Sequence, residues 1–153
     1  MTPNLHAILV LLHLLSAILW IGGMAFAHYV FRPTVAQMLE PPQRLPLIAA
    51  VLGRFFRIVA VAVVVLLATG ITLLVQVGMA NAPIGWHIML TLGLVMTAIF
   101  GFINHGLFPK LRRHVADKAW PAAAAVQNRI RVLVYTNLWL GLLTVAAAVS
   151  ARY

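Results

Sequence analysis

The sequence predicts an all-α integral membrane protein, a single domain over residues 1–153 built as an antiparallel bundle of four transmembrane helices. Apolar residues make up 63% of the chain and charged residues only 8%, whereas soluble domains carry about 25% charged residues. Four separate apolar stretches are also present. Each approaches the ~20 residues that a helix needs to cross the hydrocarbon of a bilayer.

The first predicted helix covers residues 5–31 and contains no formally charged side chain. We expect it to end before Arg32-Pro33, because proline disfavours the continuation of a helix. The second predicted helix covers residues 58–79. An amphipathic helical turn through Leu47–Phe56 extends it backward.

The third predicted helix covers residues 84–108 and is expected to stop before Pro109-Lys110, for the same reason as the first. The fourth covers residues 132–151.

The basic residues predict the orientation of these helices. Ten of the eleven Lys and Arg residues lie between the first and second helices or between the third and fourth: Arg32, Arg44, Arg54, Arg57, Lys110, Arg112, Arg113, Lys118, Arg129 and Arg131. By the positive-inside rule this side faces the cytoplasm and both termini face outward. In a bacterium the membrane would be the inner one. The lipid bilayer and topology explain the formal charge of +9, so we expect no nucleic-acid binding.

The composition excludes several kinds of chemistry. There is no cysteine, which excludes disulfides, iron–sulfur clusters and thiolate metal sites. The two acidic residues, Glu40 and Asp117, both lie outside the predicted helices. Paired-carboxylate catalysis and carboxylate-rich metal sites therefore have no residues within the membrane.

Histidines are the residues that suggest a site. Ionisable side chains inside a membrane are costly and commonly mark function, and five of the six histidines fall in predicted helices. The helical rise predicts two levels. The outer level contains His6, His13 and His87, and the inner level contains His28 and His105.

Imidazoles from facing helices can hold a metal between them. The first interpretation is haem b, with His13 and His87 as outer ligands and His28 and His105 as an inner pair. Such a centre would transfer single electrons, with a quinone or another electron carrier as partner. If the protein is an enzyme, it would be a haem-dependent membrane oxidoreductase.

Copper is the alternative. Imidazole and thioether together suit Cu(I), and His13, Met24 and His28 could line a path along the first helix, with His6 and His87 as further metal ligands. A third hypothesis is a structural or partner-binding subunit that uses the basic cytoplasmic face. The sequence leaves an oligomer open.

Several segments carry a family resemblance. His13–Gly23 (HLLSAILWIGG), Arg32-Pro33, Arg54–Arg57 (RFFR), Trp86-His87 and Asn128–Leu142 (NRIRVLVYTNLWLGL) resemble small membrane proteins of the copper resistance protein D (CopD) type. This resemblance implies copper uptake or tolerance, with His13 as the residue carried over.

The first-helix histidine followed by Trp-x-Gly-Gly is also similar to HemJ, a four-helix haem-containing protoporphyrinogen oxidase. That likeness implies haem b and porphyrinogen oxidation, again through His13. This chain departs from that pattern, because it reads His87-Ile88-Met89-Leu90 where such proteins often have a lysine.

Overall fold

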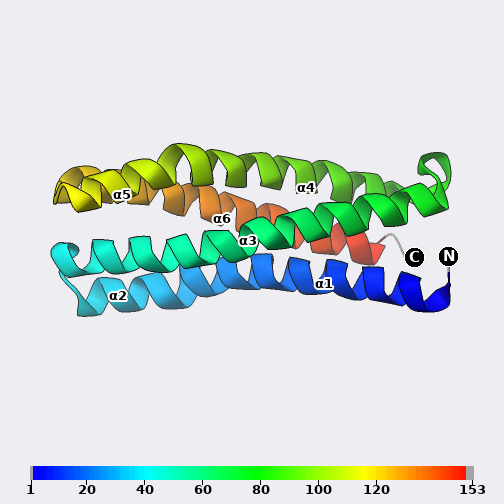
Figure 1. Cartoon of the computed structure of the whole chain (residues 1–153), viewed down its shortest axis with the longest axis horizontal. Coiled ribbons are helices and arrows are strands. Elements are labelled where there is room, and N and C mark those ends of the chain that lie inside the picture. Colours follow the sequence, from blue (N-terminus) through cyan, green and yellow to red (C-terminus); the bar gives the residue numbers. More distant parts are fainter. Residues whose placement is uncertain (1, 151–153) are drawn as a thin grey trace.

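The computed structural model describes residues 2–150, and within them the chain forms four long helical spans that run alternately in opposite directions (Figure 1). Each span is long and apolar enough to cross a membrane, so the prediction of four such helices is confirmed. The spans cover Pro3–Met38, Pro41–Val77, Ile84–Ala116 and Trp120–Ser150.

Two spans are composite. The first consists of α1 (Pro3–Phe26), the π-helical turn η1 (Ala27–Phe31) and α2 (Arg32–Met38). The third repeats this order with α4 (Ile84–Phe102), the π-helical turn η3 (Ile103–Leu107) and α5 (Phe108–Ala116). The second and fourth spans are the single helices α3 (Pro41–Val77) and α6 (Trp120–Ser150), and the 3-10 turn η2 (Met79–Asn81) follows α3.

The predicted helix ends at Pro33 and Pro109 are wrong, because the helix continues through both prolines. Proline cannot donate a backbone hydrogen bond, and its ring crowds the carbonyl four residues earlier. A π-helical turn directly precedes each proline and widens the backbone there: Arg32 N–H bonds the Ala27 oxygen, and Phe108 N–H bonds the Ile103 oxygen, each five residues back. The irregular turns thus accommodate the prolines without ending the spans.

The spans are longer than a bilayer requires. Helix α3 has 37 residues and would be about 55 Å long at 1.5 Å per residue, against about 30 Å of hydrocarbon. It includes the predicted extension through Leu47–Phe56, and α6 begins twelve residues before the predicted start. The additional length lies at the end that holds α2 and α5, which we call the basic end (residues 32–57 and 108–131).

The side chains pack most tightly at the basic end. Leu45, Leu111, Ala123 and Ile130 there are at most 1% exposed. Towards the other end, many large apolar side chains stay on the outside, with Val64 67% exposed. Water drives apolar burial where the bundle leaves the membrane, but lipid solvates the apolar side chains of the membrane-spanning part equally well.

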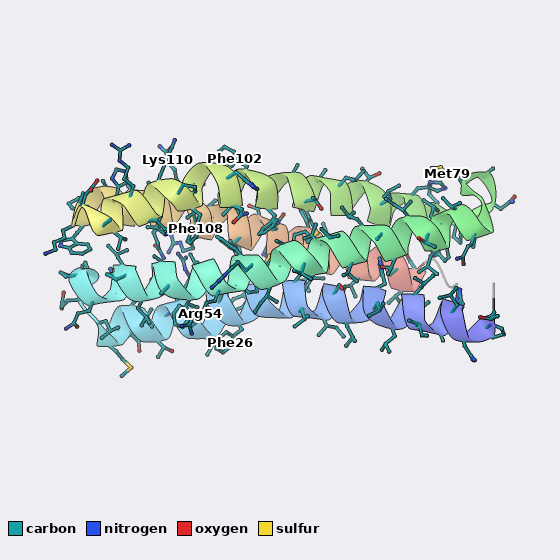
Figure 2. All side chains as sticks on the ribbon, in the orientation of Figure 1. Phe26, Arg54, Met79, Phe102, Phe108 and Lys110 are labelled. Atoms are coloured by element: carbon teal, nitrogen blue, oxygen red, sulfur yellow. The ribbon has the colours of Figure 1, made fainter. Side chains whose placement is uncertain are left out.

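The four spans associate as two hairpins. Helix α1 packs chiefly on α3, and α4 packs chiefly on α6. Ring contacts cross the core between the hairpins, with Trp20 6.1 Å from Phe100 and Phe56 5.8 Å from Phe100. In Figure 2 Phe108 points into the bundle, whereas Phe26 and Phe102 point away from it; their exposed fractions are 58% and 59%.

Close packing within the membrane depends on a glycine of α6. A β-carbon built on the buried Gly141 would lie 2.9 Å from Cγ1 of Ile21 and 3.3 Å from Cε of Met96. We expect Gly141→Ala to destabilise the protein by about 1–3 kcal/mol, because the added methyl group overpacks the contact of three helices. Unfolding in detergent micelles would measure this.

The matched control is Gly22→Ala, since a β-carbon there would meet nothing within 4 Å. Helix propensity alone should make that variant neutral or more stable by up to about 1 kcal/mol. Equal effects of the two substitutions would contradict the close approach at Gly141.

Candidate functional site

His13 on α1 is held by the backbone and a hydroxyl of α3. Its Nδ1 lies 3.1 Å from the Leu66 carbonyl oxygen and 3.0 Å from Oγ1 of Thr69. A carbonyl oxygen can only accept, so Nδ1 carries the proton and donates it. The Thr69 hydroxyl donates to the Val65 oxygen at 2.7 Å, which leaves its lone pairs to accept from His13. The hydrogen bonds therefore assign the tautomer of this imidazole.

The second ring nitrogen of His13 stays available. Among the described residues Nε2 has no hydrogen-bond partner, so in the neutral ring it presents a lone pair. The ring lies directly on the α3 backbone: a β-carbon built on Gly70 would come within 2.9 Å of Cε1 of His13. Histidines that bind metals commonly donate their other N–H to a carbonyl in this manner, which fixes the ring.

The structure does not gather the predicted outer histidines around His13. Helices α1 and α4 run in the same direction, and the Trp20–Phe100 ring contact sets their relative level. Counted from that contact, His87 stands near the level of His6, and His13 lies about six residues, or ~9 Å, deeper. His13 faces α3 rather than α4. The His13–His87 ligand pair therefore stays a prediction, with no contact to support it.

The two inner histidines have separate surroundings. His28 lies in η1 and stacks on Tyr135 of α6, with ring centroids 4.5 Å apart. His105 lies in η3, is exposed, and donates from Nδ1 to the Gly101 oxygen of its own span at 3.1 Å. No hydrogen bond or ring contact between these two histidines is found in residues 2–150. Their role as a ligand pair likewise remains a prediction.

Neutral donors, rather than further histidines, lie in the middle of the bundle. Met24 and Met96 are 2% and 3% exposed and belong to one core cluster. Asn137 of α6 is 2% exposed and donates from Nδ2 to the Met96 carbonyl oxygen at 3.1 Å. Its Oδ1 is buried with no partner. The Thr144 hydroxyl lies 3.9 Å from Sδ of Met96.

The side chains of Thr69 and Asn137 each bond to another helix. The sequence gave no signal for the unpaired oxygen of Asn137 or for a role of Met96. Residues 2–150 contain no group of three or more His, Cys, Asp or Glu side chains that could hold a metal ion. A metal at His13 would therefore need thioether or carbonyl donors as well.

Two cavities lie elsewhere, nearer the basic end. One has a volume of about 100 Å³ and the other about 10 Å³, and both are lined by Arg32 and Leu52 near the basic end. Pockets for organic cofactors usually have about 300–1,000 Å³. Neither cavity is lined by His13 or His87. The residues around these cavities thus do not fit a haem on the predicted outer ligands.

Comparison with known proteins identifies one family. The family model described as copper resistance protein D matches residues 49–151, about two thirds of the chain. The matched part includes Thr69, Met96 and Asn137, and it begins after α1. No curated protein and no solved structure matches the chain.

The link between His13 and α3 can be measured by a double-mutant cycle with His13→Ala and Thr69→Val. We expect a coupling energy of about 0.6–1.7 kcal/mol, the range for hydrogen bonds between membrane helices. Thr72→Val is the control partner, because the exposed Thr72 hydroxyl bonds only the Ala68 oxygen of its own helix at 2.7 Å. Additive effects of His13→Ala and Thr69→Val would contradict the contact.

Proposed function

Because the chain belongs to the copper resistance protein D family, we propose that it binds copper within the membrane and moves it across, in copper uptake or tolerance. Copper is the substrate in this proposal. The observation that carries it is the geometry of His13, whose ring is fixed on α3 through Nδ1 while Nε2 stays free.

The donors near His13 suit Cu(I). Imidazole nitrogen and thioether sulfur are ligands that Cu(I) accepts, and neither adds a charge to the interior of the membrane. Counted from the Trp20–Phe100 contact, Met96 lies about three residues, or ~4.5 Å, deeper than His13. Met24 follows deeper along α1, and His28 lies one turn beyond it.

The proposed path therefore runs from His13 past Met96 and Met24 to His28. The exposed His6 lies before it, and the unpaired Oδ1 of Asn137 supplies a neutral oxygen beside Met96. Neither cavity is lined by His13, Met24 or Met96. In this proposal copper passes from one ligand of the path to the next.

Family membership favours copper over the haem interpretation. Haem b, one-electron transfer and a quinone partner have no support from the matched family or from the cavities. The structural-subunit hypothesis gains nothing specific either, whereas the His13 geometry has a direct chemical use in copper binding.

We further propose that the basic end faces the cytoplasm, with both termini outward, in a bacterial inner membrane. Ten of the eleven Lys and Arg residues lie at the basic end, and this asymmetry supports that orientation.

Cu(I) binding to the purified protein tests the function. We expect His13→Ala to lower the affinity at least tenfold because it removes the ligand, and Thr69→Val to lower it about tenfold because it removes one of the two partners that fix the ring. Competition with a Cu(I) chelator gives the affinity, and Cu(I) uptake into proteoliposomes gives transport. His114→Ala is the control, since His114 lies in α5 at the basic end, away from the proposed path.

Unchanged Cu(I) affinity and transport in His13→Ala would refute the proposal. A Soret band in the protein as isolated, lost in His13→Ala, would restore the haem interpretation in its place.

Cysteine labelling tests the orientation, because the chain has no native cysteine. We expect a membrane-impermeant maleimide to label Ala80→Cys in intact cells and to label Ala125→Cys only after permeabilisation. Both alanines are exposed and lie at opposite ends of the bundle. The reverse pattern would place the basic end outside.

A further inference from the structure

A groove between the first span and α3 opens at the level where the apolar part of the bundle meets the basic end. Its cavity of about 100 Å³ is lined mainly by apolar side chains and a glycine, with one charged residue, Arg32. The apolar part of the lining includes Gly23, Phe26, Phe31, Ile48 and Phe55. Phe26 is 58% exposed and points away from the bundle (Figure 2), so the groove is bordered by a lipid-facing side chain.

The smaller cavity shares Arg32 with this groove and adds a second arginine. It is lined by Arg32, Arg131 and His28. The Arg32 side chain donates to the Gln127 carbonyl oxygen at 3.3 Å, which ties the first span to α6 and uses one of its five N–H groups. Two arginines therefore line the same small cavity.

Within residues 2–150 no carboxylate pairs with Arg32 or Arg131. The two acidic residues of the chain are Glu40 and Asp117, and neither of them lines either cavity. Asp117 pairs with Arg113 at 3.9 Å, the one ion pair found in residues 2–150. Arg32 is partly withdrawn from water and shares the small cavity with the like charge of the exposed Arg131, so this arrangement favours a bound anion.

The depth of the arginines indicates the source of the anion. Arg32 follows the 26 uncharged residues from His6 to Phe31, about 39 Å of helix, and Arg131 immediately precedes the apolar part of α6. Both therefore lie where hydrocarbon gives way to headgroups. At this level the abundant anions are lipid phosphates, which arginine binds in a bidentate manner.

We propose that Arg32 and Arg131 bind the headgroup phosphate of an anionic phospholipid, whose acyl chain lies in the groove against Gly23, Phe31 and Phe55. The glycine matters for this, because a β-carbon on Gly23 would collide with the Phe55 ring that forms the groove wall. The groove itself is lined by no residue of the proposed copper path, and the site meets that path only at His28, which lines the smaller cavity with the two arginines.

Binding to delipidated protein in a neutral detergent tests the site. Native mass spectrometry would count bound phosphatidylglycerol, and thermal unfolding would report its stabilising effect. We expect a saturable site for phosphatidylglycerol that binds phosphatidylcholine at least tenfold more weakly. Arg32→Gln and Arg131→Gln should each weaken phosphatidylglycerol binding about tenfold.

Arg57→Gln is the matched control. Arg57 is an exposed arginine just before the apolar part of α3, and it lines neither cavity. It should change the affinity less than twofold. Arg131 is exposed, so replacing it should leave the packing intact. Arg131→Gln therefore tests the site even if Arg32→Gln fails to fold.

Three results would overturn the proposal. Equal binding of the two lipids would show that the groove selects no headgroup. An equal loss in Arg57→Gln would indicate diffuse attraction to the whole basic end. Full stabilisation by inorganic phosphate alone would show that the arginines bind a free anion and the groove holds no lipid.

Discussion

Inside hydrocarbon no water completes a hydrogen bond, so each polar group of a span needs a partner within the protein. This requirement explains the polar contacts of the bundle. The hydroxyls of Thr72, Thr97 and Thr136 bond carbonyls one turn back on their own helices. The Thr69 hydroxyl does the same and also accepts from His13 of α1, and Asn137 bonds the backbone of α4. Oδ1 of Asn137 is the one fully buried side-chain nitrogen or oxygen without a partner in residues 2–150, and the amide nitrogen of the same side chain bonds the Met96 backbone.

The side chains pack differently at the two ends of the bundle because the ends lie in two solvents, water and lipid. At the basic end water drives the burial of Leu45, Leu111 and Ile130, and the four spans continue beyond the hydrocarbon as a packed helical bundle. Between the lipid tails no such force acts, and contacts depend on small residues such as Gly70 and Gly141. The close approach that Gly70 permits is what brings the His13 ring onto the α3 backbone. A polar site within the membrane therefore depends on local fit more than on a tight surrounding core.

The sequence predicted the four spans well, because apolar length and the clustering of Lys and Arg are direct consequences of the bilayer. It failed at Pro33 and Pro109, since a π-helical turn leaves no clear mark in residue pattern. The sequence also paired histidines by their expected depth in the membrane, which was counted along each helix separately. Depth does not reveal which helices pack together, and α1 packs on α3 rather than on α4. The role of Leu66, whose carbonyl oxygen holds His13, is invisible to any pattern of side chains.

The matched family region begins at residue 49 and so leaves α1 and His13 outside it. The match itself covers the part of the chain from α3 to α6, which holds Met96 and Asn137. The hydrogen bonds from His13 to Leu66 and Thr69 connect the two parts, because their acceptors lie within the matched region. A packing histidine needs only one partner for its proton. Here α3 fixes the ring from one side and leaves the opposite nitrogen without a partner in residues 2–150, which is the arrangement that a metal ligand requires.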